Sequence, residues 1–365
     1  MSSTRPPRKR QKKQSGGGDL YAPTPAQWAK MSSYGSFVVT DAQGQEVVFR
    51  LGDTAAVLPG SKKIGEALEL HRYWIVKIIA IRGKHVLATR SRGNREKSEY
   101  WIKIRWFYSP TEVSWRIPGF QAAHCSKYER IYSDHSELVS PLTFNELVSV
   151  QKFHEDDPDQ PHIDCDQFYT RYFLKTSSKQ AEISNYVLQT STDLGLSVGC
   201  ICGKPYDVNN PELFHVMHMC PRPRCRRFHH SCCLLEHGYW TRMTHPLMRL
   251  LNSPDTNEIP MFPSKSSKYA AHLPADLLLL AAQPMVRGAA LDDTLGEKIA
   301  GNCRDVTYAR RTVYAVMQGT TKVPNNWRDC VDLTAAIVDP HLPTLELDGT
   351  GEELVLSCPN CYGPI

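Results

Sequence analysis

The sequence predicts a mostly β domain, followed by a smaller, cysteine-rich α+β domain that carries a long, partly helical insert. Its length of 365 residues suits about two domains. Residues 72–81 and 100–108 are rich in β-branched and aromatic side chains, and ten of the twelve cysteines lie from Cys200 to Cys361. Helical patterns fill most of the long gap before the last cysteine pair, which supports an insert within the second domain.

The chain begins with a basic segment. Residues 1–18 contain six lysines and arginines, no acidic residue and a final run of glycines, and we expect residues 1–40 to be a disordered basic tail. Such a tail is typical of a nuclear import signal or of a weak contact with nucleic acid. Because the whole chain carries a formal net charge of only +5, the remainder is nearly neutral, which disfavours DNA recognition by a folded basic surface.

Membrane insertion and secretion are not expected. No run of eighteen apolar residues occurs, and no apolar segment follows the basic residues near the start. Without secretion a disulfide framework is disfavoured, so the clustered cysteines favour metal binding.

Two segments predict the long strands of the first domain. Residues 72–81 read RYWIVKIIAI, and residues 100–108 read YWIKIRWFY and alternate regularly. The alternation places Ile102, Ile104, Trp106 and Tyr108 on one face of the second strand. Taken alone, such aromatic residues are more often part of a core than of a binding site.

The limits of the first domain follow from weaker signals. Strand-like segments at residues 147–153 and 168–173 extend it over residues 45–175. Residues 176–198 are expected to form a connecting helix or linker. The second domain then covers residues 199–365, with an insert at about residues 238–350.

Seven of the cysteines and one histidine form four closely spaced pairs. Two pairs provide the four thiolate or imidazole ligands that a tetrahedral zinc ion prefers, so four pairs predict two structural zinc ions. The pair that contains the histidine has two possible registers, because His229 and Cys232 have the same spacing as His230 and Cys233. The pairs are Cys200 with Cys202, Cys220 with Cys225, His230 with Cys233, and Cys358 with Cys361.

This order, with the segments CICGKPYD, CPRPRC, FHHSCCLL and SCPNC, resembles a PHD finger. The ligands of that family interleave, and the family spacing after Cys225 favours His230 with Cys233. The resemblance therefore implies one zinc ion on Cys200, Cys202, His230 and Cys233, and a second on Cys220, Cys225, Cys358 and Cys361. Fingers of this family that read methyl-lysine use aromatic walls, for which Phe228, Tyr206 and Met217 are the corresponding positions.

The insert departs from the family by its length. Helical patterns at residues 274–283, 308–317 and 327–337 predict a helical subdomain packed on the finger, with Cys303 and Cys330 as ordinary buried thiols.

The first domain resembles a BAH domain. The resemblance lies in RYWIVKI at 72–78, IRWFYSP at 104–110, ERIYSDH at 129–135 and LVSPLTFNELVSVQKF at 138–153. BAH domains that read trimethyl-lysine form an open cage from three aromatic residues, which match Trp74, Trp106 and Tyr108. Tyr132, Asp134 and His135 match positions that contact the flanking histone residues. A trimethylammonium group is poorly hydrated and is attracted to aromatic faces.

The combination of the two domains is similar to fungal and plant effectors of Polycomb-type silencing, which recognise histone H3 trimethylated at lysine twenty-seven. The resemblance implies a nuclear chromatin reader, not an enzyme, that binds the histone H3 tail and nucleosomes or silencing complexes. The finger would provide a second contact with the histone or with a partner.

Three other interpretations stay open. A RING-like ubiquitin ligase also carries two interleaved zinc ions, although its histidine normally comes earlier. A DNA-binding or purely scaffolding protein is a second alternative. The segment HEDDPDQPHIDCD at 154–166 offers carboxylates and histidines for a hydrolytic metal site, but it lacks paired helical spacing and is better interpreted as an acidic loop. That this loop faces the basic histone tail is a further hypothesis.

Overall fold

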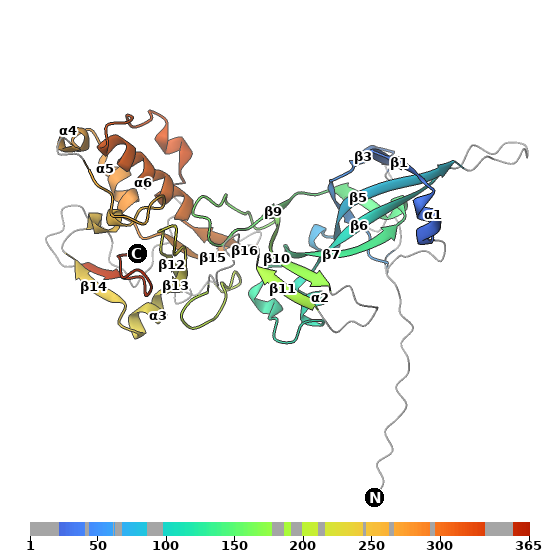
Figure 1. Ribbon diagram of the computed structural model, residues 1–365, viewed down its shortest axis with the longest axis horizontal. Helices are drawn as coiled ribbons and strands as arrows, with labels where there is room; N and C mark the ends of the chain where they lie inside the picture. The colour runs from blue at the N-terminus through green and yellow to red at the C-terminus, as the bar shows by residue number, and fades with distance from the viewer. Residues whose placement is uncertain are drawn as a thin grey trace, which may run out of the picture. The chain divides into compact units, whose positions relative to one another are not determined.

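The computed structural model describes residues 22–40, 44–60, 62, 68–85, 98–176, 186–190, 199–210, 216–243, 246–262, 266–292, 296–332 and 353–365 (Figure 1). The chain divides into two compact units, each made of several segments. The first unit contains residues 1–109, 132–149 and 174–187, and the second contains residues 110–131, 150–173 and 188–365. None of the helices in the described ranges is long and apolar enough to cross a membrane.

The predicted division at residue 175 differs from these units. Residues 110–131 and 150–173, which we expected in the first domain, belong to the second unit. The strands β7 (Glu129–Val139) and β10 (Phe168–Thr176) consequently begin in the second unit and end in the first.

The first unit is built on antiparallel strands. The largest sheet has the order β11-β10-β7-β6-β5-β4-β8, with β1 paired antiparallel to β5, and with β9, which lies in the second unit, paired parallel to β10. The side chains of Ile75, Ile78 and Ile104 are fully or almost fully buried, as the alternation of apolar residues predicts. Besides β7 and β10, its elements are α1 (Pro25–Ala29), β1 (Ser32–Tyr34), β2 (Ser36–Thr40), β3 (Glu46–Arg50), β4 (Thr54–Val57), η1 (Leu70–Arg72), β5 (Trp74–His85), β6 (Ser98–Tyr108), η3 (Pro141–Thr143), β8 (Phe144–Leu147) and the first part of β11 (Tyr186–Thr190).

The start of the folded chain is a correction to the sequence prediction. Residues 22–40 were expected in a disordered tail, but they form α1, β1 and β2. The hairpin of β2 and β3 pairs Phe37 with Phe49, and both rings pack against Phe144 with centroids 4.9 and 5.2 Å away. These buried aromatic side chains stabilise a segment whose sequence shows no clear period. The basic residues up to position 13 lie outside the described residues.

The second unit contains the cysteine-rich region and the insert. A four-stranded sheet has the order β13-β12-β15-β16, and β14 pairs with β17. The helices α5 and α6 pack on this region, and Leu277, Val306 and Met217 share its core. Its elements are α2 (Pro110–Ser114), η2 (Ala122–His124), β9 (Val150–Lys152), β12 (Met217–Met219), β13 (Phe228–His230), α3 (Ser231–Glu236), β14 (Trp240–Met243), η5 (Pro246–Leu251), α4 (Ser266–Ala270), α5 (Ala275–Ala282), β15 (Val286–Asp292), β16 (Gly296–Gly301), α6 (Cys303–Met317), η6 (Trp327–Cys330) and β17 (Glu353–Leu356).

Three local predictions need correction. The single strand expected at residues 147–153 is two short strands, β8 and β9. The expected linker at 176–198 contains the strand β11. The third helix of the insert is a short 3-10 helix, η6, and residues 333–337 of that prediction lie outside the described residues.

Candidate functional site

The strands β5 and β6 bring three aromatic side chains to one end of the sheet. Their antiparallel register pairs Ile75 with Phe107 and Val76 with Trp106. Because opposite residues of paired strands share a face, Trp74 and Tyr108 follow on the same face as Trp106. The three residues expected in a cage are therefore neighbours, and we call Trp74, Trp106 and Tyr108 the aromatic site.

The rings of the aromatic site are held by defined contacts. Trp74 and Trp106 meet edge to face, with ring centroids 5.5 Å apart and planes at 87°. The indole N–H of Trp106 donates a hydrogen bond to Oε2 of Glu137 at 3.2 Å. The hydroxyl oxygen of Tyr108 lies 2.5 Å from Nδ1 of His135. Trp106 and Tyr108 are each 8% exposed, whereas Trp74 is half-buried, so Trp74 offers the more accessible ring.

The strand β7 presents different residues to the two faces of β6. His135 and Glu137 contact the aromatic site, but Tyr132 packs against Phe107 with centroids 4.6 Å apart, on the opposite face. By strand alternation Asp134 follows Tyr132. Of the three residues expected to contact the flanking histone residues, His135 alone lies beside the aromatic site on the same face. Glu137 is not among the residues expected from the sequence, although alternation from His135 identifies it once the face is known.

Two clusters of four side chains in the second unit have the geometry of metal centres. One contains Cys200, Cys202, His230 and Cys233, and the other contains Cys220, Cys225, Cys358 and Cys361. Within each cluster the ligand atoms lie within 4.8 Å of one another. The structure thus assembles the same two sets of four that the spacing and the family resemblance implied.

The donor atoms fit zinc. The Sγ atoms of Cys225 and Cys358 are 3.6 Å apart, and Sγ of Cys202 lies 3.5 Å from Nδ1 of His230. Ligands on a tetrahedral zinc ion, with bonds of about 2.0–2.3 Å, are separated by about 3.3–3.8 Å. Four protein ligands at each centre leave no position for water or substrate, so the two clusters have the composition of structural rather than catalytic zinc sites.

The structure resolves the register of the histidine pair. His230 joins the first cluster, whereas both ring nitrogens of His229 are buried without a hydrogen-bond partner, and burial lowers the pKa of His229. The β-hairpin of β12 and β13 supports both centres, since it ends in Cys220 on one strand and His230 on the other. The pair Cys358 and Cys361 comes from the turn after β17, far along the chain.

The three positions considered for an aromatic wall are buried in the cysteine-rich region. Phe228, Tyr206 and Met217 are 2%, 4% and 1% exposed. The guanidinium carbon of Arg287, from the insert, lies 4.0 Å from the Phe228 ring centroid, and the Tyr206 hydroxyl donates to the Gly288 carbonyl at 2.9 Å. These three positions form core around the insert and not a methyl-lysine pocket.

The segment expected as an insert also adds a strand to the sheet of the cysteine-rich region. The strand β15 pairs with β12, opposite Met217 and His218, so that β12 has a partner on both edges. The open edge of a sheet is a common docking site for a peptide strand, and among the described residues no strand pairs with the outer edges of β13 and β16. The prediction of a helical insert was thus incomplete. Cys303 is buried as expected, but Cys330 is exposed.

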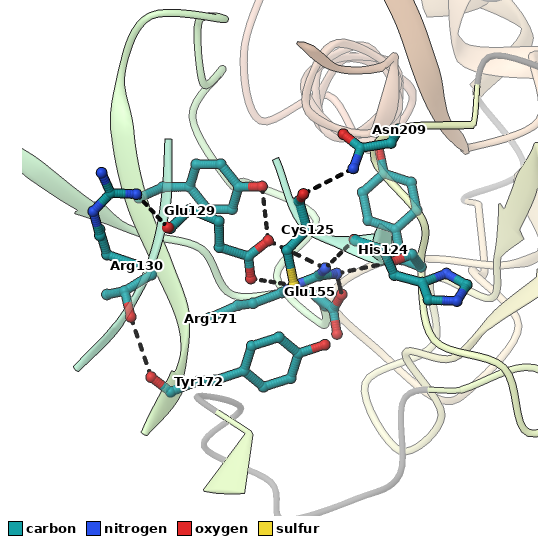
Figure 2. Close-up of polar contacts among 11 residues, drawn as sticks. His124, Cys125, Glu129, Arg130, Glu155, Arg171, Tyr172 and Asn209 are labelled. Carbon is teal, nitrogen blue, oxygen red and sulfur yellow. Dashed lines mark hydrogen bonds and ion pairs between the residues drawn. The ribbon is translucent and has the colours of Figure 1, made fainter. Parts of the chain in front are cut away.

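A buried ionic network in the second unit involves the segment expected as an acidic loop (Figure 2). Arg171, which is 1% exposed, donates to Glu129 and to Glu155, each at 2.8 Å. It also donates to the carbonyl oxygens of His124 and Tyr206, which joins strand β10 to the start of the finger. Glu155 and Asp156 are each 8% exposed, and burial raises the pKa of Asp156. At these residues the segment is part of the core and is not a solvated surface.

Comparison with known proteins finds no protein-family model and no curated protein that matches the chain. Among solved structures, the chain is similar to the BAH domain of yeast Rsc2, with 10% identical residues and a TM-score of 0.24 over 40% of this chain. The chain spans about half, 51%, of that structure.

Proposed function

We propose that the protein is a nuclear chromatin reader that binds a trimethylated lysine of the histone H3 tail, with lysine twenty-seven as the first candidate, and acts in transcriptional repression. The observation that carries this proposal is the aromatic site, where Trp74 and Trp106 stand perpendicular to each other beside Tyr108. The face of an aromatic ring carries the negative charge density that attracts a methylated ammonium, and each good contact is worth about 0.5–2 kcal/mol.

The second unit has a supporting role in this proposal. Its two four-ligand centres suit structural zinc ions, because all four ligands of each ion would come from the protein and none of them would be free for catalysis. We propose a protein without enzymatic activity. A RING-like ubiquitin ligase also carries two interleaved structural zinc ions, but its histidine normally comes earlier in the chain than His230 does among these ligands. A second histone or partner contact by the finger would use the outer edge of β13 or β16, because both edges of β12 are paired.

The test uses the full zinc-loaded chain and a panel of histone peptides that differ in the methylated lysine and in the number of methyl groups. We expect selective binding of one trimethylated peptide, and about a tenfold weaker affinity in Trp74→Ala. Trp115→Ala is the matched control, because Trp115 is 77% exposed and lies in the second unit. Equal affinity of wild type and Trp74→Ala for every peptide would contradict the proposal.

A further inference from the structure

Glu137 places a carboxylate at the edge of the aromatic site. Its Oε2 atom accepts the hydrogen bond of the Trp106 indole N–H at 3.2 Å, and the Trp106 ring in turn meets the Trp74 ring at 5.5 Å. This hydrogen bond lies at the rim of the indole, so it engages the ring edge and not its π faces. The carboxylate therefore sits beside the place where a ligand would stack and does not replace the ligand.

The basic residue that precedes Trp106 in β6 points away from the aromatic site. The basic residue Arg105 donates to the Tyr132 hydroxyl at 3.4 Å, on the face opposite the aromatic site. Glu137 lies on the face of Trp106. A side chain that enters the aromatic site thus meets a carboxylate, while this guanidinium is directed to the other side of the sheet.

Two physical effects of this carboxylate favour a cation. As a charged acceptor it polarises the N–H bond and increases the electron density of the indole, which strengthens the attraction of its face for a cation. It also attracts a cation directly, over a separation of roughly 6–8 Å if that cation stacks on the ring at the usual distance. A neutral group of the same shape gains nothing from either effect.

We infer that Glu137 is a specificity-determining residue of the aromatic site, which makes the site select a positively charged methylammonium over a neutral side chain of equal size. This inference rests on the function proposed above and specifies the ligand of that site. A purely structural Glu137, which only orients the Trp106 ring, would affect charged and neutral ligands equally. The two roles therefore predict different effects on the ratio of the affinities for the charged and the neutral ligand.

The experiment compares two peptides that differ in one atom. One carries trimethyl-lysine, and the other carries its neutral isostere, in which a quaternary carbon replaces the ammonium nitrogen. Affinities of both are measured for the full zinc-loaded protein by competition against a fluorescent trimethylated peptide. The variant is Glu137→Gln, whose amide oxygen still accepts the indole hydrogen bond but carries no charge.

We expect Glu137→Gln to reduce the preference for the charged peptide by about three- to fivefold, with little change in affinity for the neutral one, and we expect the effect to shrink at high salt. Glu146→Gln is the matched control, since Glu146 is exposed on β8 of the same unit. Thermal denaturation of each variant checks that the fold is retained.

The outcomes separate this inference from the proposal beneath it. If wild type binds the trimethylated peptide but Glu137→Gln leaves the ratio of the two affinities unchanged, or weakens both peptides equally, the inference is wrong and the reader function stands. If wild type binds neither the trimethylated peptide nor its neutral isostere, whichever histone sequence is used, the proposed reader function is wrong. The inference that rests on it is then wrong as well.

Discussion

The aromatic site of the first unit and the two metal-ligand clusters of the second are organised over very different lengths of chain. Trp74, Trp106 and Tyr108 come from two paired strands, and strand alternation aligns them without any buried ion. In the second unit each metal cluster joins distant segments, with Cys220 and Cys358 in one of them, and Arg171 bridges two glutamates in the core. A change in the first region should therefore affect binding more than folding, and a change in the second should affect folding first.

Loss of zinc is the strongest test of this difference. We expect Cys358→Ser to unfold much of the second unit, because structural zinc contributes on the order of 10 kcal/mol in small domains. The measurements are zinc content, expected at two ions per chain in wild type, and thermal denaturation with and without a chelator. Cys330→Ser is the control, since this exposed thiol belongs to neither cluster. Unchanged melting after complete removal of the metal would show that the second unit does not depend on its clusters.

The next largest effect is expected at Arg171. Replacing it with methionine leaves the carboxylates of Glu129 and Glu155 buried without their cation, which should lower the free energy of unfolding by about 3–5 kcal/mol. Urea denaturation measures this loss. Arg311→Met is the comparison, because Arg311 also pairs with two carboxylates but its side chain is 38% exposed. That change should cost less than about 1 kcal/mol, and equal losses would mean that burial does not decide the contribution.

The parts of the molecule that could be predicted from sequence are those with local signals. The alternation of YWIKIRWFY predicted the strand β6 and the common face of Trp106 and Tyr108. Close spacing predicted the four ligand pairs, because neighbouring ligands of a zinc ion come from one tight turn, whereas the resemblance to a PHD finger implied how the pairs combine into two sets. In each case a few adjacent residues carry the whole pattern.

The parts that could not be predicted depend on partners far along the chain. Arg171 lies in a strand-like segment where a charged residue normally faces solvent, and Glu129 is 42 residues away. Pairing of β15 with β12 likewise has no local signal, since β-strand sequences do not specify which distant edge they join. The early helix α1 is marked by a capping box at Thr24 and Gln27, a signal that was present and was overlooked.

A pH-dependent ion pair gives the smallest expected effect and refines the comparison within the second unit. Nε2 of His162 lies 3.7 Å from Oδ2 of Asp305, and this carboxylate raises the pKa of His162 above its usual 6.5. A raised folded-state pKa stabilises the fold fully below the unfolded value, and this stabilisation is lost as the pH rises through the folded value. Because the His162 side chain is 39% exposed, solvent screening limits its contribution to a few tenths of a kcal/mol.

We expect His162→Gln to be less stable than wild type at pH 5.5 and equally stable at pH 8.5, with the exposed His272→Gln unchanged at both. A deficit that is larger at pH 8.5 would show that neutral His162 packs favourably, and that burial rather than charge holds this contact.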